Sequence, residues 1–154
     1  MGKYEQLLDE AYDLNLKVFE NCKFKSNADA LINDDRIALS EKLDTTIKKS
    51  CALAEEIAHF KYSSGNIIDL RDIRSSREEY RARKQTVFET MPIESIIEAF
   101  EYGVTDMYEL IDYLEVTEKF FEEGIDIYKK HFGLNVVIGD YFITFEPLQV
   151  GKRL

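Results

Sequence analysis

The stretch that decides the fold of this 154-residue chain is Ser50-Cys51-Ala52-Leu53-Ala54-Glu55-Glu56-Ile57-Ala58-His59. It contains no proline or glycine, and its small and apolar residues favour a buried helix over a solvated one. A helix turns about 100° per residue, so Glu55 and His59, four residues apart, share one face and can reach the same point. Buried glutamate and histidine need polar partners. The stretch therefore predicts a buried helix with a polar site.

The last five residues of this stretch are a variant of the HExxH motif, with glutamate in place of the first histidine. In a zinc site of this kind Glu55 and His59 would bind the metal. Glu56 would act as general base and take a proton from the attacking water. The simpler alternative is a surface face of ion pairs, because amphipathic helices are rich in glutamate. Cys51, one turn earlier, is either a further ligand or a core residue.

Hydrophobic periodicity predicts the elements around this helix. Apolar residues three and four apart predict a first helix over 4–15. Asp44 or Thr45 would cap the central helix, which would run to about Tyr62. Short apolar runs beside turn formers predict three strands that form a small antiparallel sheet, at 16–19, 30–32 and 36–39.

The second half of the chain is predicted to be mostly helical. Four helices are expected, over 72–91, 92–102, 107–114 and 117–132. Thr105 or Asp106 would cap the third of these and Thr117 the fourth, and the two together have helix-turn-helix spacing. Strands at 135–138 and 141–145 surround Gly139-Asp140 and predict a terminal hairpin. The expected class is α+β.

Two sets of apolar residues stand out in this half. The first is an inward stripe of the helix after Pro92, made of Ile93, Ile96, Ile97 and Phe100. The second is aromatic and forms either core or a surface that contacts a partner protein. Its members are Phe120, Phe121, Tyr128, Phe132, Tyr141, Phe142 and Phe145.

Composition limits the class of protein. A chain of 154 residues with 45% hydrophobic and 32% charged residues fits one globular domain, and no apolar run is long enough to span a membrane. The first residues lack a signal peptide, so a cytoplasmic protein is expected. There Cys22 and Cys51 would stay free thiols. A net charge of -10 disfavours nucleic acid as a partner.

The stretch from Ser50 to His59 resembles the metal-binding helix of the ImmA/IrrE metallopeptidases, in particular the phage-type members. The likeness continues at 64–69, at Glu79-Tyr80-Arg81-Ala82-Arg83 and at Met91-Pro92. It implies a zincin-like small metallopeptidase domain over 1–154, with a metal-binding core at 1–92 and a helical and hairpin part at 93–154. It also implies Glu79 as the third ligand of Zn²⁺ or another divalent metal. An ion pair between Glu79 and Arg83 is the alternative.

Asp69 is a candidate to orient His59 from outside the ligand set, or else to cap the following helix. Glutamate at position 55 is the departure from most of the family. Two carboxylates and a neutral imidazole would neutralise the charge of Zn²⁺, which makes a weaker Lewis acid than a site with two histidines.

The resemblance further implies an endopeptidase that cleaves a regulatory partner, such as the helix-turn-helix repressor of a phage or mobile element. A second hypothesis is a binding module that keeps the peptidase fold and controls a repressor by association. The third is a DNA-binding regulator that uses 107–132. It is the weakest, because its second helix carries Glu118, Glu122, Glu123 and Asp126.

Overall fold

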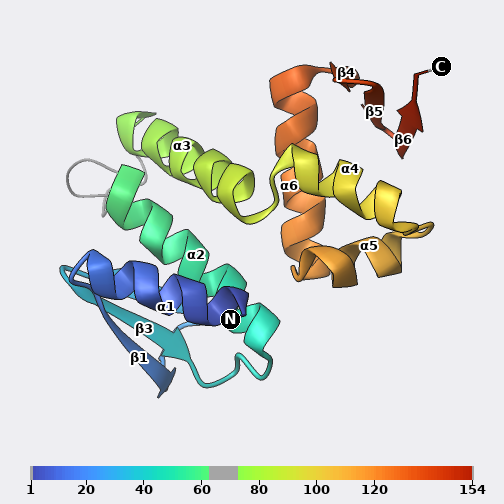
Figure 1. Ribbon diagram of the computed structural model, residues 1–154. Coiled ribbons are helices and arrows are strands. Elements are labelled where there is room, and N and C mark those ends of the chain that lie inside the picture. Colours follow the sequence, from blue (N-terminus) through green and yellow to red (C-terminus); the bar gives the residue numbers. More distant parts are fainter. Residues whose placement is uncertain (1, 63–72, 154) are drawn as a thin grey trace. The chain divides into compact units, whose positions relative to one another are not determined.

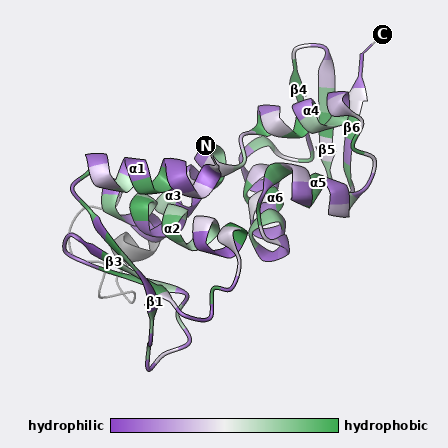
Figure 2. Cartoon of the chain, turned by 60° about the horizontal axis from the view of Figure 1, so that its bottom comes forward, coloured by the Kyte–Doolittle hydropathy of each residue, from purple (hydrophilic) through white to green (hydrophobic). Residues whose placement is uncertain are grey.

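The computed structural model describes residues 2–62 and 73–153, and it confirms the α+β class. Contacts divide the chain into two compact units, Met1–Thr86 and Val87–Leu154. The boundary falls inside helix α3, Ile73–Thr90 (Figure 1). None of the described helices is long and apolar enough to cross a membrane, and hydrophilic residues recur along them (Figure 2). One domain over 1–154 stays a prediction.

The first unit contains two helices and a three-stranded sheet before α3 begins. The helices are α1 (Lys3–Asp13) and α2 (Thr46–Tyr62). The strands are β1 (Lys17–Cys22), β2 (Ala30–Asn33) and β3 (Arg36–Ser40), and their order in the sheet is β1-β3-β2. As predicted, β2 and β3 form an antiparallel hairpin that closes at the pair Asn33 and Arg36.

The antiparallel prediction is wrong for β1, which pairs with β3 in parallel, with Val18 opposite Ile37. After β1 the chain reverses direction and forms β2 two strand positions away from β1. β3 then lies between them and pairs with both. Residues 23–29 make this connection, and an extended segment of that length readily spans two strand spacings of about 4.8 Å. Strand patterns alone do not reveal which strands are neighbours.

The core of the first unit lies between the sheet and α1 and α2 (Figure 1). Leu53 and Ile57 of α2 meet Ile37 and Leu39 of β3 there, and each of the four is at most 1% exposed. All residues from Ser50 to Ala54 are buried, which confirms that this is a buried helix. Thr45 caps it, because its hydroxyl accepts the backbone N–H of Lys48 at 3.1 Å.

The second unit holds the remaining helices, α4 (Ile93–Tyr102), α5 (Met107–Leu114) and α6 (Glu118–Phe132). Their ends follow the predicted signals. Asp106 accepts the N–H of Glu109 at the start of α5, and Thr117 accepts that of Phe120 at the start of α6. Gly103 ends α4 with φ of 105°, a left-handed conformation that glycine adopts without strain.

The predicted terminal hairpin is present as β4 (Asn135–Ile138) and β5 (Tyr141–Phe145), and a further strand, β6 (Leu148–Lys152), extends it. The inward stripe of α4 is correct for its three isoleucines, which are at most 7% exposed. It is wrong for Phe100, which is 41% exposed. Phe100 lies at the last turn of α4, where the helix leaves the core.

Candidate metal centre

Helix α2 presents the three polar residues of the predicted motif at the edge of the core. Glu55, Glu56 and His59 are half-buried, whereas Ala54, Ile57 and Ala58 between and beside them are buried. The apolar residues hold this part of α2 against the first unit. The three polar side chains therefore sit on a rigid element, partly withdrawn from water.

Helix α3 brings Glu79 to this group. Oε2 of Glu79 lies 3.3 Å from Nδ1 of His59, and the two side chains are 32% and 19% exposed. They are twenty positions apart in the sequence, so the contact is tertiary. The structure thus places together the imidazole and the carboxylate that the family resemblance pairs as ligands.

The ring of His59 has a buried nitrogen without a hydrogen bond. Among the described residues, Nδ1 of His59 has no hydrogen-bond partner, although the Glu79 carboxylate is 3.3 Å away. A buried polar atom left unpaired costs about 1–3 kcal/mol. Two ligands about 2.0–2.2 Å from one tetrahedral zinc would be about 3.4 Å apart. The pair therefore fits a shared metal ion in both spacing and donor type.

Glu56 lies beside this pair in an environment that disfavours its charge. Burial raises the pKa of Glu56 to about 7, and the nearby carboxylates of Glu55 and Glu79 contribute to the rise. A general base works best when its pKa lies close to the working pH. The sequence assigned this role to Glu56 from its place in the motif alone, and the shifted pKa is a separate physical argument for it.

The other predicted members are not assembled around His59. Within residues 2–62 and 73–153, no three His, Cys, Asp or Glu side chains come close enough to hold a metal ion together. Glu55 therefore does not join His59 and Glu79 in one cluster in this structure. Asp69 lies outside the described residues. Cys51 is buried in α2, and among the described residues it forms no disulfide.

Lys61 is a residue near the site that sequence reasoning missed. Its Nζ lies 2.7 Å from Oε1 of Glu10 on α1, and it also approaches the ring of Tyr62 at 5.1 Å. The ion pair ties the last turn of α2, two residues after His59, to α1. No local pattern signals it, because Glu10 is 51 positions away along the chain.

A half-buried histidine and two glutamates on adjoining helices are donor and base types used by peptidases that work with a metal ion. The chain belongs to a peptidase family. Residues 12–126, about three quarters of it, match the family described as IrrE N-terminal-like domain. This confirms the family resemblance, and the matched range contains all four site residues, Glu55, Glu56, His59 and Glu79. No curated protein and no solved structure matches the chain.

Proposed function

We propose that this chain is a metal-dependent endopeptidase of zincin-like fold that acts on a partner protein, with zinc as the expected metal. The observation that carries the proposal is the buried, unpaired Nδ1 of His59 beside the Glu79 carboxylate. Glu55 would complete the ligand set through a change of side-chain rotamer, since it lies one helical turn before His59. Glu56 would be the general base.

Each residue has its own task in such a reaction. A divalent cation, when bound, would supply a Lewis acid that polarises the scissile carbonyl. His59 and Glu79 would hold that cation through an imidazole nitrogen and a carboxylate oxygen. Glu56 accepts a proton from the attacking water and delivers it to the nitrogen of the leaving amine. The buried apolar residues of α2 would hold Glu56 and His59 in fixed positions during the two proton transfers.

The partner that we propose is the helix-turn-helix repressor of a phage or mobile element. We propose that the protein acts on it in the cytoplasm. This part of the proposal rests on family membership, since no feature of the described site selects a sequence to cleave. The acidic net charge of -10 favours a protein partner over nucleic acid.

The second candidate is a binding module that keeps the peptidase fold and regulates a repressor by association. The position of Glu55 favours it, because three ligands do not converge among the described residues. A catalytically inactive protein would keep its effect on the partner when Glu56 becomes Gln.

Metal content tests the site directly. Mass spectrometry on the wild type and on Glu55→Ala, His59→Ala and Glu79→Ala, each dialysed against trace zinc, should give about one zinc per chain for the wild type only. Glu78→Ala is the matched control, since it removes an acidic side chain next to Glu79 on α3. It should keep the metal. A folded wild type without metal would favour the binding module.

A further inference from the structure

The two units carry very different charges. Val87–Leu154 holds 14 Asp and Glu against 5 Lys and Arg, a net charge of -9. Met1–Thr86 holds 16 against 15, a net charge of -1. Nearly all of the net negative charge of the chain therefore belongs to the second unit. A surface of that unit attracts cations and repels acidic molecules.

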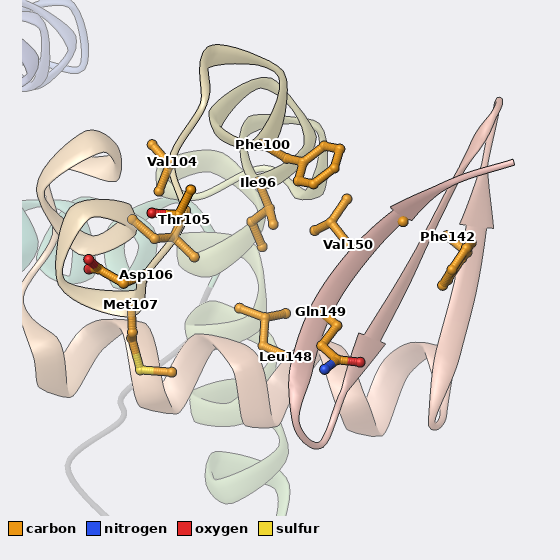
Figure 3. Close-up of a pocket in the computed structure, with 12 residues that line it drawn as sticks. Ile96, Phe100, Val104, Thr105, Asp106, Met107, Phe142, Leu148, Gln149 and Val150 are labelled. Carbon is orange, nitrogen blue, oxygen red and sulfur yellow. The ribbon is translucent and has the colours of Figure 1, made fainter.

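The second unit also contains a groove of about 510 Å³ between α4, the start of α5 and the sheet edge. Figure 3 shows Ile96 and Phe100 of α4 facing Leu148 and Val150 of β6 across it. Met107, at the start of α5, and Phe142 of β5 also line it. The walls of the groove are therefore mostly apolar.

Three large apolar side chains of this groove remain in contact with water. Phe100 is 41% exposed, Met107 is 50% exposed and Phe142 is 40% exposed. Gathered apolar surface of this kind marks a place where another molecule binds. The exposure also shows that the groove is open rather than enclosed, which suits the side chains of a protein segment better than a small ligand.

The wall at β6 depends on a glycine. Gly151 is paired with Phe142 on the neighbouring strand, and a Cβ atom at position 151 would overlap the Phe142 ring. The missing side chain thus lets the aromatic ring lie across β6. The arrangement keeps the ring in the lining of the groove.

Acidic groups lie in the groove and near it. Asp106 is part of the lining, and Glu109 accepts the N–H of Thr105 at 3.4 Å beside it. Near Phe100, the ring of Tyr141 lies 6.2 Å away. Burial raises the pKa of Tyr141, and a hydrogen bond to Glu101 and the charges of Glu101 and Asp140 add to the rise. Two basic residues are also near this end: Lys152 lies over the Tyr141 ring, and Arg153 donates its backbone N–H to the carbonyl of Asp140. The described charges near the groove are thus mainly negative.

We propose that this groove docks a basic segment of a partner protein, with apolar side chains that insert between Phe100, Met107 and Val150. Apolar anchors would supply most of the affinity, since truncating a few buried anchors usually removes most binding energy. The acidic rim would favour lysine and arginine around those anchors and speed their association. The proposal concerns the second unit and does not depend on the peptidase assignment.

The probe is a labelled synthetic peptide of leucine and lysine in an amphipathic pattern, about five helical turns long. Its comparator has the same leucines with glutamate in place of lysine. Fluorescence anisotropy with the full chain should show binding of the lysine peptide and little binding of the glutamate peptide. Met107→Ala and Phe100→Ala should each weaken binding about tenfold. Circular dichroism confirms that both variants are folded, and Met107 is the safer site because it is exposed.

Charge is tested with two matched double variants. Asp106→Asn with Glu109→Gln removes two charges at the groove and should weaken binding about three- to tenfold at low salt. Asn preserves the helix cap that Asp106 forms. Asp112→Asn with Glu122→Gln removes two exposed charges from the same unit and should change binding less than twofold.

Four outcomes would overturn the proposal. Equal weakening by both double variants would mean that the peptide responds to net charge alone. Unchanged binding in Met107→Ala and Phe100→Ala would mean that it binds elsewhere. Equal binding of an uncharged peptide with the same leucines would remove the basic partner class. Self-association that is lost in Met107→Ala, seen by analytical ultracentrifugation, would assign the groove to a second copy of the chain.

Discussion

The two units of this chain use charge in opposite ways. The first is almost neutral, with a net charge of -1, yet it half-buries a histidine and glutamates at one end of α2. The second has a net charge of -9 and exposes apolar side chains at its surface groove. Buried ionisable groups suit chemistry, and exposed apolar surface suits recognition. The proposed reaction and the proposed docking therefore belong to different units.

The largest expected effect separates these two roles. Glu56→Gln removes the proposed general base and should lower the rate of partner cleavage by about 10²- to 10⁴-fold, because an amide cannot take up the proton. The number of metal ions per chain and the affinity for the leucine and lysine peptide should not change. A cleavage assay, metal analysis and anisotropy on the same preparation measure all three. Loss of peptide binding in this variant would break the division between the units.

A pair of core truncations tests whether the units also differ in stability. Leu53, fully buried in α2, and Ile127, 3% exposed in α6, are the matched positions. Leu53→Ala should cost about 2–5 kcal/mol, because it removes buried methyl groups and leaves a cavity. Hydrogen exchange should show faster opening of the first unit only.

Ile127→Ala should have a similar cost in the second unit. Urea titration gives the size of each loss, and hydrogen exchange gives its location. If either variant increased hydrogen exchange equally in both units, the two units would unfold as one cooperative structure. They would then differ in charge but not in stability.

The third effect is a pH dependence of the metal-free protein that originates in the first unit. The pKa of Glu56 is about 7 in the folded chain and about 4.5 in its ordinary state. The unfolded chain therefore releases this proton at lower pH. The free energy of unfolding should fall as the pH rises from about 4.5 to about 7, by about 2–3 kcal/mol in total.

Glu56→Gln should remove this fall, whereas Glu122→Gln in the second unit should preserve it. Urea titrations of the dialysed, metal-free proteins at several pH values measure the difference. Two results would show that the Glu56 carboxyl is not withdrawn from water. One is a wild type whose free energy of unfolding does not change between pH 4.5 and 7, and the other is the same pH dependence in both variants.

Local features of this chain could be predicted from the sequence. The apolar run from Ser50 to Ala54 indicates a buried helix because adjacent residues alone determine its pattern. Thr45, Asp106 and Thr117 cap their helices through contacts three residues away. Glu79 was placed next to His59 by family resemblance and not by physics, since no local spacing joins the two.

Contacts between distant residues could not be predicted. The parallel pairing of β1 with β3 depends on where the chain turns after Cys22, and strand β6 is recognised only once β5 is beside it. Phe100 has the periodicity of a core residue, but it lies at the last turn of α4, where the core ends. Lys61 and Glu10 meet only because α1 packs on α2. Apolar periodicity predicts which face of a helix is buried, but not where along the helix the burial ends.

The smallest effect concerns the two helix caps of the second unit. Thr117→Ala leaves the N–H of Phe120 without its acceptor and should cost about 1 kcal/mol. Asp106→Asn keeps an acceptor for the N–H of Glu109 and should change stability by only a few tenths of a kcal/mol. Thermal unfolding measures both. A large loss in Asp106→Asn would mean that the charge at the groove also stabilises α5, and the charge variants would then need a different acidic position, such as Glu101.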